Sequence, residues 1–286
     1  MTIEHTFVDT SLGKLHVASS GSGPLLIFLH GFPEFWYAWH LQLEQFAASH
    51  HCLAPDLPGY NLSDKPSQLS SYEIPNVVKA IIELIDKFST SGKATIVGHD
   101  WGGVLSWYLA CLYPEKLEKL VIINSPHPAI FSRELASNPA QQKASMYIGL
   151  FVTPLAEPTL SANNYAHLAK VVFDGCKNET VFSHEDRAKY LKAWQEPGAL
   201  TCGLNYYRAN ALAKRQKITV CNVDTLVIWG ENDTALLTGN LNGLEDLVPR
   251  LTIKRVPNAG HWIVHEEPEL VGQYIQDFLC LSKTEK

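Results

Sequence analysis

The sequence predicts an α/β fold, a mostly parallel, doubly wound sheet with a helical insertion, and three observations support this prediction. Short continuous apolar runs recur along the 286 residues, as is typical of strands buried on both faces of a parallel sheet. Segments with helical periodicity lie between these runs. The alternation stops between residues 127 and 217, where only helical segments are found.

The predicted strands begin with a hairpin, His5–Asp9 and Lys14–Ser19, whose connection Ser-Leu-Gly is typical of a tight turn. Apolar runs of strand length follow, and we expect them to form the parallel part of the sheet. These runs are Leu25–Leu29, His51–Pro55, Ala94–Val97, Leu120–Ile123, Thr225–Trp229 and Leu251–Arg255.

Helices are predicted between these strands from the spacing of apolar residues. In the segment 75–88, Val77, Ile81 and Leu84 recur at helical intervals, and charged residues occupy the opposite face. Such a helix buries one face against the sheet. The predicted core helices are Trp36–Ala48, Pro75–Phe88, Gly102–Leu112 and Pro268–Leu279.

The stretch without strands is expected to form a separate cap. We predict a core domain of residues 1–126 and 218–286, with a helical cap of residues 127–217 inserted between core strands 6 and 7. Ligands of open α/β sheets bind at the carboxyl edge of the strands, which is where such a cap lies. The helices predicted within it are Gln141–Leu150, Asn164–Val172, His184–Gln195 and Gly203–Ala213.

Composition excludes several classes of partner. The net charge of −6 and the absence of a Lys/Arg run argue against nucleic acid or an anionic membrane as a partner. The apolar runs are too short to span a bilayer, and the first residues lack the pattern of a signal peptide. The six cysteines show no paired spacing, which is typical of reduced thiols. We therefore expect a cytoplasmic protein, either a monomer or a homodimer.

The most informative motif is a turn, Gly-His-Asp-Trp-Gly, that joins an apolar strand to an apolar helix around Asp100. This is the strand–elbow–helix context of a catalytic nucleophile, with aspartate in place of serine. Glycines at 98 and 102 permit the tight turn, because a Cβ there would clash where strand and helix cross. Asp100 alone could equally be a helix cap, so the assignment depends on its partners.

Those partners follow the two last predicted strands. Asp233 and His261 lie just beyond them, and the order nucleophile, acid, histidine is that of the α/β-hydrolase fold. In that fold the loop after the first parallel strand, here His-Gly-Phe-Pro, donates one backbone N–H to an oxyanion hole. We expect the donors to be the amides of Phe32 and Trp101. The residues expected to line the substrate pocket are His30, Pro33 and Trp36, although helix packing explains Trp36 equally well.

An aspartate nucleophile restricts the reaction. A carboxylate that attacks a saturated carbon forms an ester on the enzyme, and water can then release the product. Asp100 therefore indicates an epoxide or an alkyl halide as the electrophile. Asp100 is already ionised at neutral pH, so His261, oriented by Asp233, would activate the water that cleaves the ester. No metal or organic cofactor is needed, and His261 and His265 lack a third ligand nearby in sequence.

Over nearly its full length the chain resembles the α/β-hydrolase-fold epoxide hydrolases, which are hydrolases acting on ether bonds. The resemblance implies that two cap tyrosines protonate the epoxide oxygen. Tyr207 and Tyr147 match these positions, with Tyr206 as the competitor for Tyr207. The expected substrates are a small epoxide and water. The matching segments are His30–Glu34, Gly98–Gly103, Tyr147–Phe151, Asn205–Arg208, Trp229–Asp233 and Gly260–Trp262.

Two alternatives remain open at this point. Haloalkane dehalogenases share the Asp-Trp pair and hold the halide with a second donor, which is commonly Asn or Trp. Phe32 offers no such side-chain donor, but a cap tryptophan such as Trp194 could. The haloacetate dehalogenases need arginines just after the nucleophile, where this chain has Trp101-Gly-Gly. A non-catalytic ligand-binding protein of the same fold is the second alternative, although no triad member is missing.

Overall fold

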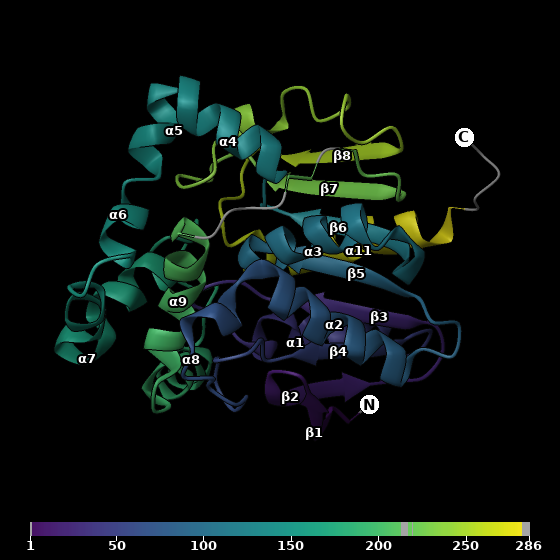
Figure 1. Ribbon diagram of the computed structural model, residues 1–286, viewed down its shortest axis with the longest axis horizontal. Coiled ribbons are helices and arrows are strands. Elements are labelled where there is room, and N and C mark those ends of the chain that lie inside the picture. The colour runs from purple at the N-terminus through teal and green to yellow at the C-terminus, as the bar shows by residue number, and fades with distance from the viewer. Residues whose placement is uncertain (1, 213–216, 219, 282–286) are drawn as a thin grey trace.

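The molecule is built around a central sheet, and its strand order determines where the candidate site lies (Figure 1). This computed structural model describes residues 2–212, 217–218 and 220–281. Its strand order is β1-β2-β4-β3-β5-β6-β7-β8, antiparallel from β1 to β4 and parallel from β4 to β8. The strands are β1 Glu4–Thr10, β2 Gly13–Ser20, β3 Leu25–Leu29, β4 His51–Pro55, β5 Ala94–His99, β6 Leu117–Ile123, β7 Thr225–Gly230 and β8 Leu251–Val256.

Helices cover both faces of this sheet, and each face has its own apolar core. Helices α2 and α3 bury side chains against one face, and α1 and α11 against the other. Helix α2 begins with Pro75 in its first turn, which needs no backbone N–H there, and buries Val77, Ile81 and Leu84. The elements outside the cap are η1 Trp36–Trp39, α1 His40–Phe46, η2 Leu69–Tyr72, α2 Ile74–Phe88, α3 Asp100–Leu112, η3 Pro114–Lys116, η4 Thr238–Leu241, α10 Ile263–Glu266 and α11 Pro268–Cys280.

A helical insertion between β6 and β7 forms the cap, and most of it lies beyond the carboxyl ends of the parallel strands (Figure 1). The predicted fold class is therefore confirmed. The domain boundaries at residues 126 and 218 stay a prediction, and Ala213, the predicted end of a cap helix, lies outside the described residues. The cap helices are α4 Pro128–Ser137, α5 Pro139–Ala144, α6 Tyr147–Phe151, α7 Ala156–Phe173, α8 His184–Gln195 and α9 Ala199–Leu212.

The predicted helices differ from the observed ones where the backbone turns. The single helix expected over 36–48 is a 3₁₀ turn followed by α1, and the one expected over 141–150 is split into α5 and α6. Helix α4 was not predicted. In α7 the helical geometry is interrupted at 162–165, where Asn163 and Asn164 adopt left-handed conformations with φ of 51° and 56°. Asparagine tolerates that conformation better than most residues, whereas Tyr165, with a φ of 64°, adopts it at a cost.

In the part of the chain that the structure describes, no helix combines the length and the apolarity needed to cross a membrane.

Candidate active site

The turn after β5 presents Asp100 at the carboxyl edge of the sheet. Asp100 has a φ of 49°, a left-handed conformation that is strained for a residue with a Cβ. The crossing is tight, because a Cβ on Gly102 would overlap the carbonyl of Leu29. The hydroxyl of Ser125, just after β6, donates to the Asp100 carbonyl at 2.7 Å. Neighbouring strands therefore stabilise the strained turn and fix where the carboxylate lies.

The loop after β3 contacts the Asp100 carboxylate through its backbone. The N–H of Phe32 donates to Asp100 Oδ1 at 2.8 Å, as an oxyanion-hole donor would. The Trp101 amide belongs to the first turn of α3, where backbone N–H groups have no acceptor within the helix. Its role as the second donor stays a prediction.

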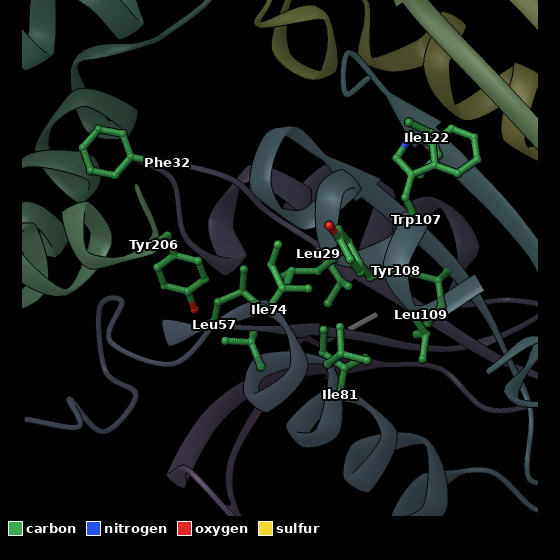
Figure 2. Close-up of a cluster of buried hydrophobic side chains, with 14 of the residues drawn as sticks. Leu29, Phe32, Leu57, Ile74, Ile81, Trp107, Tyr108, Leu109, Ile122 and Tyr206 are labelled. Atoms are coloured by element: carbon green, nitrogen blue, oxygen red, sulfur yellow. The ribbon is translucent and has the colours of Figure 1, made fainter. Parts of the chain in front are cut away.

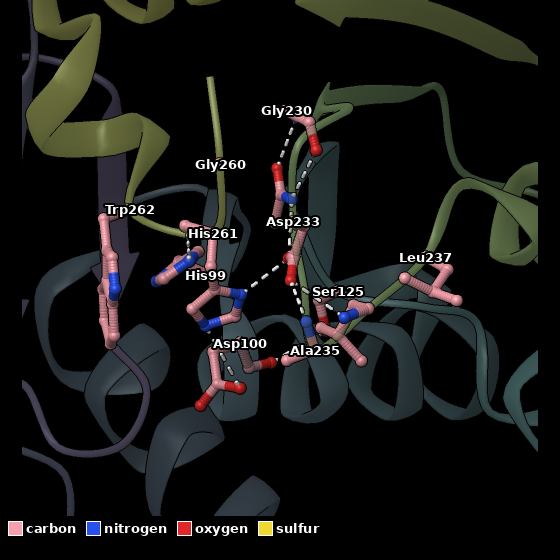
Figure 3. Close-up of polar contacts among 12 residues, drawn as sticks. His99, Asp100, Ser125, Gly230, Asp233, Ala235, Leu237, Gly260, His261 and Trp262 are labelled. Carbon is pink, nitrogen blue, oxygen red and sulfur yellow. Dashed lines mark hydrogen bonds and ion pairs between the residues drawn. The ribbon is translucent and has the colours of Figure 1, made fainter. Parts of the chain in front are cut away.

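His261 and Asp233 lie beside the nucleophile, on the loops after β8 and β7 (Figure 3). The Nδ1–H of His261 donates to Asp233 Oδ2 at 2.7 Å. On the other side of the ring, Nε2 is 3.8 Å from Asp100 Oδ2, beyond hydrogen-bond distance. The structure thus brings together the three residues that the chain order suggested, with the histidine between the two carboxylates.

Four donors hold the Asp233 carboxylate in place. The amides of Ala235 and Leu236 both donate to Oδ1 at 2.8 Å. Besides His261, the side-chain amide of Asn124 donates to Oδ2 at 2.8 Å. Burial raises the pKa of Asp233, but the charge of His261 and these hydrogen bonds outweigh it and lower the pKa overall. Asp233 therefore stays ionised as the partner of the histidine.

The environment of His261 favours its charged form. Burial lowers the pKa of the imidazole, but the Asp233 carboxylate and its hydrogen bond raise it. The charges of Asp100 and Glu34 act in the same direction, and the pKa of His261 rises to about 9. The state of Asp100 therefore helps to set the protonation of His261.

Two cap tyrosines share a cavity with the nucleophile. Asp100, Trp101, Tyr147 and Tyr207 all line a cavity of about 110 Å³. The ring centroids of Tyr147 and Tyr207 are 6.4 Å apart. Burial, followed by the charge of Asp100, raises the pKa of both phenols, so they remain neutral donors. The other lining residues are mostly apolar: Ile74, Val104, Tyr108, Ser125, Pro126, Pro128, Phe131, Ile148, Ala211 and Leu236.

Tyr206, the neighbour of Tyr207, points elsewhere. Its hydroxyl donates to the carbonyl of Pro58 at 2.9 Å, and its side chain is fully buried. Figure 2 shows it within the buried apolar cluster, on the side that also holds Phe32. Of the two adjacent tyrosines, Tyr207 is therefore the one that faces Asp100.

Comparison with known proteins identifies the family to which this chain belongs. A family model described as the alpha/beta hydrolase fold matches residues 24–268. The chain is 42% identical over 281 residues to the AB hydrolase superfamily protein YfhM of Bacillus subtilis (strain 168), covering 96% of each. It is 34% identical over 284 residues to Epoxide hydrolase 4 of Homo sapiens, covering 95% of this chain and 76% of the human protein. A solved structure of the epoxide hydrolase from Bacillus megaterium in complex with an inhibitor matches with a TM-score of 0.90 and 35% identity, covering 96% of this chain and 99% of that one.

The chain belongs to the epoxide hydrolase family of the α/β-hydrolase fold. The family predicted from the motifs around Asp100 and the cap tyrosines is therefore confirmed.

Two of the residues that were expected to line the substrate pocket of this epoxide hydrolase family member make other contacts. His30 is fully buried, accepts from the Leu57 amide through Nε2 at 3.0 Å, and thus fixes the loop. Trp36 packs against the rings of His5 and His16 on the far side of that loop. Trp36 is not among the described residues that line the cavity with Asp100, and its assignment to the substrate pocket stays a prediction.

Pro33 is near the site but does not line the same cavity as Asp100. It lines a second cavity of about 20 Å³, together with Phe32, Leu168 and Trp194. Its carbonyl accepts a hydrogen bond from the Trp194 indole at 2.7 Å. Pro33 therefore joins the core loop to cap helix α8.

A buried polar cluster beneath His261 was not predicted. Glu34 contacts His99 Nδ1 at 3.0 Å and His265 Nε2 at 2.6 Å, and it accepts from the Tyr190 hydroxyl at 2.9 Å. His99 Nε2–H donates to the His261 carbonyl at 2.9 Å. Burial raises the pKa of Glu34, but the two histidines lower it well below its usual value. Glu34 and His99 each lie inside a segment that matches the family, His30–Glu34 and Gly98–Gly103. This placement could have indicated the cluster from the sequence.

Proposed function

We propose that this chain is an epoxide hydrolase that converts an epoxide to a vicinal diol through an ester on Asp100. The observation that carries the proposal is that Asp100, Tyr147 and Tyr207 line one cavity. A carboxylate nucleophile and neutral phenol donors suit ring opening, because the first attacks the carbon while the second protonates the departing oxygen.

In the first step, a carboxylate oxygen of Asp100 forms a bond to one epoxide carbon while the bond from that carbon to oxygen breaks. The oxygen takes a proton from Tyr147 or Tyr207, and a hydroxyalkyl ester results. The 2.8 Å contact from Phe32 N–H to Oδ1 holds one carboxylate oxygen, which leaves the other to attack.

In the second step, His261 takes a proton from water, and the resulting hydroxide attacks Cγ of Asp100. The oxyanion formed there accepts from the Phe32 amide and, we propose, from the Trp101 amide. Collapse of this intermediate releases the diol and restores the carboxylate. The proton held by His261 replaces the one that the tyrosine donated, so the net reaction adds one water to the epoxide.

Alkylation also prepares His261 for its role as a base. The Asp100 carboxylate is one of the charges that raise the pKa of His261 to about 9. Once Asp100 is esterified it carries no charge, so this contribution disappears and the pKa falls. A larger fraction of the histidine is then neutral at the stage where a base is needed.

Two features argue against the haloalkane dehalogenase alternative. Phe32 has no side-chain donor for a halide, and the Trp194 indole already donates to Pro33 at 2.7 Å. Trp194 is also not among the described residues that line the cavity with Asp100. Both cap tyrosines are, which favours an epoxide oxygen as the leaving group.

The test uses styrene oxide and, separately, 1-bromobutane, with diol and bromide as the measured products. We expect diol from the first and no bromide from the second; bromide without diol would refute the epoxide assignment. In His261→Ala, an adduct of one epoxide per chain should accumulate on the peptide that contains Asp100, as detected by mass spectrometry. The double variant Asp100→Ala/His261→Ala is the control and should carry none.

A further inference from the structure

The segment that carries His261 is attached directly to the cap. His261 and Trp262 follow one another in the loop between β8 and α10 (Figure 3). The indole N–H of Trp262 donates to the Val171 carbonyl at 3.0 Å. The N–H of Lys177 donates at 2.6 Å to Oε1 of Glu266, the last residue of α10. Since Val171 is in α7 and Lys177 follows that helix, both bonds join the cap to the segment that places the histidine.

Glu266 uses both of its carboxylate oxygens at this junction. Oε1 accepts from Lys177 in the cap, and Oε2 accepts from the N–H of Gly260, the residue before His261, at 2.5 Å. The Glu266 side chain is buried, so water competes little for either oxygen. Hydrogen bonds from backbone N–H groups to a carboxylate are short and strong. One side chain therefore holds the backbone of the cap close to the backbone beside His261.

The cap side of the junction permits a close approach. Val171 lies in the last turn of α7, where backbone carbonyls are short of donors, and the Trp262 indole supplies one. Gly175 lies just beyond this turn, and a Cβ there would be 2.9 Å from Trp262 Nε1 and would overlap the Val171 carbonyl oxygen. A larger residue at 175 would therefore push the cap away from the indole.

The position of His261 matters most in the proposed second step. Its ring is held by Asp233 at 2.7 Å and its carbonyl by His99 at 2.9 Å. Nε2 lies 3.8 Å from Asp100 Oδ2, and a general base must be within about 2.6 to 3.2 Å of the water that it deprotonates. A misplacement of about 1 Å can cost about a hundredfold in rate. A shift of the backbone at Gly260 would move the imidazole relative to the ester.

We propose that Glu266 is a positioning residue for ester hydrolysis, because it ties the loop that carries His261 to the cap segment 171–177. The proposal rests on the epoxide hydrolase function proposed above. It separates the two chemical steps: Asp100 and the cap tyrosines open the epoxide, whereas His261 acts on water only afterwards. Loss of the bridge therefore slows hydrolysis of the ester and leaves ring opening nearly unchanged.

The test compares Glu266→Gln with Glu267→Gln in single-turnover experiments with styrene oxide. Glu266→Gln keeps the size of the side chain, but its NH₂ group cannot accept, so one of the two backbone N–H groups loses its acceptor. Glu267→Gln is the matched control, since it breaks only the ion pair with the Lys177 ammonium of the same cap segment. Consumption of styrene oxide measures ring opening, and decay of the adduct on the Asp100 peptide, followed by quenching and mass spectrometry, measures hydrolysis.

We expect ester hydrolysis in Glu266→Gln to slow by about 10- to 100-fold, with ring opening changed by less than about threefold. In Glu267→Gln both rates should stay within about threefold of those of the unmodified protein. Trp262→Phe removes the hydrogen bond to Val171 but keeps a ring beside His261, and it should slow hydrolysis by about three- to tenfold.

The burst of styrene oxide consumption counts the folded active sites, so partial unfolding of a variant lowers the burst amplitude and leaves the rate of adduct decay unchanged. An adduct that decays at the normal rate in Glu266→Gln would overturn the proposal. Equal slowing of ring opening and hydrolysis would also overturn it, because Glu266 would then support the fold in general. If the unmodified protein consumes no styrene oxide, the proposed function fails instead.

Discussion

The core side and the cap side of the candidate site are held by different forces. On the core side, directional hydrogen bonds from backbone and side chains fix Asp100 and Asp233, and His261 lies between these two carboxylates. On the cap side, Tyr207 is surrounded by aromatic edges, including those of Trp101 at 5.1 Å and Phe151 at 5.0 Å. Hydrogen bonds at the strand ends thus fix the positions of Asp100, Asp233 and His261, whereas aromatic packing fixes the position of Tyr207 in the cap.

Hydrogen bonds and aromatic packing respond differently to amino-acid substitution. A hydrogen bond weakens steeply when its geometry changes, so the triad tolerates little movement. Aromatic packing tolerates substitutions that conserve volume, because it has no single required distance or direction. Changes in the aromatic packing of the cap should therefore alter selectivity, whereas changes at the strand ends or at the two cap hydroxyls should alter the rate of the chemical steps. The following variants test that division.

Asp233→Asn should have the largest effect. Without the carboxylate, the imidazolium that forms when His261 takes a proton from water loses its main stabilisation. We expect kcat for diol formation to fall by about 10³- to 10⁴-fold. Ring opening by Asp100 should continue, so a stopped-flow experiment should show a burst of one epoxide consumed per active site.

The burst separates this variant from one that is misfolded. A variant that consumes no epoxide would indicate a folding defect, which circular dichroism would reveal. Turnover at the normal rate would contradict the role of Asp233 as the partner of His261.

Tyr207→Phe should have the next largest effect, and Tyr206→Phe is its control in the adjacent position. Removing the Tyr207 hydroxyl takes away a donor to the epoxide oxygen, so the rate of alkylation should fall by about 10²-fold. Tyr206→Phe removes only the hydrogen bond to the Pro58 carbonyl and should cost about 1 kcal/mol of stability. Single-turnover kinetics and thermal denaturation measure the two effects. Equal alkylation rates for the two variants would return Tyr207 to a packing role.

The fold could be predicted because its signals are local. Continuous apolar runs and helical periodicity revealed the strands and the mostly parallel sheet, and the elbow around Asp100 could be recognised from neighbouring residues alone. The insertion could be recognised because strands are missing from it. Its individual helices were less predictable, since α5 and α6 divide at a point that no glycine or proline marks.

The parts of the site that were missed depend on tertiary contacts. Asn124 is an ordinary asparagine after a strand, and only the return of β7 brings it to Asp233. Adjacent residues on a helix point about 100° apart, so helical periodicity could not choose between Tyr206 and Tyr207, and the choice of Tyr207 depended on the resemblance. Trp36 follows the His-Gly-Phe-Pro loop in the sequence, yet its ring packs against His5 and His16 of the N-terminal hairpin.

The rate of ester hydrolysis should also depend on pH. This effect should be smaller than those of the variants above, but it identifies the base. His261 acts as a base only when neutral, so the rate should rise with pH until the pKa of the esterified enzyme is passed. That pKa lies below about 9, the value with Asp100 ionised, because the ester removes one negative charge while Asp233 and Glu34 remain. At pH values below this pKa, we expect the rate of ester hydrolysis to fall by about tenfold for each pH unit.

Decay of the preformed ester, followed by rapid mixing between about pH 6 and 9, measures this profile. In Asp233→Asn the midpoint should move to lower pH, since a second charge that raises the pKa of His261 is lost. A rate independent of pH over this range would mean that His261 is not the base.

Trp194→Phe should have the smallest effect on activity, and it tests the boundary between the two sides. The indole N–H donates to the Pro33 carbonyl and thereby fastens α8 to the loop that carries Phe32. Its loss leaves a buried carbonyl without a donor, so stability should fall by about 1 to 3 kcal/mol. Because the indole does not line the cavity at Asp100, kcat/KM for styrene oxide should change by less than about threefold. The dehalogenase interpretation predicts a different result: bromide release from 1-bromobutane that disappears in this variant would make Trp194 a halide donor.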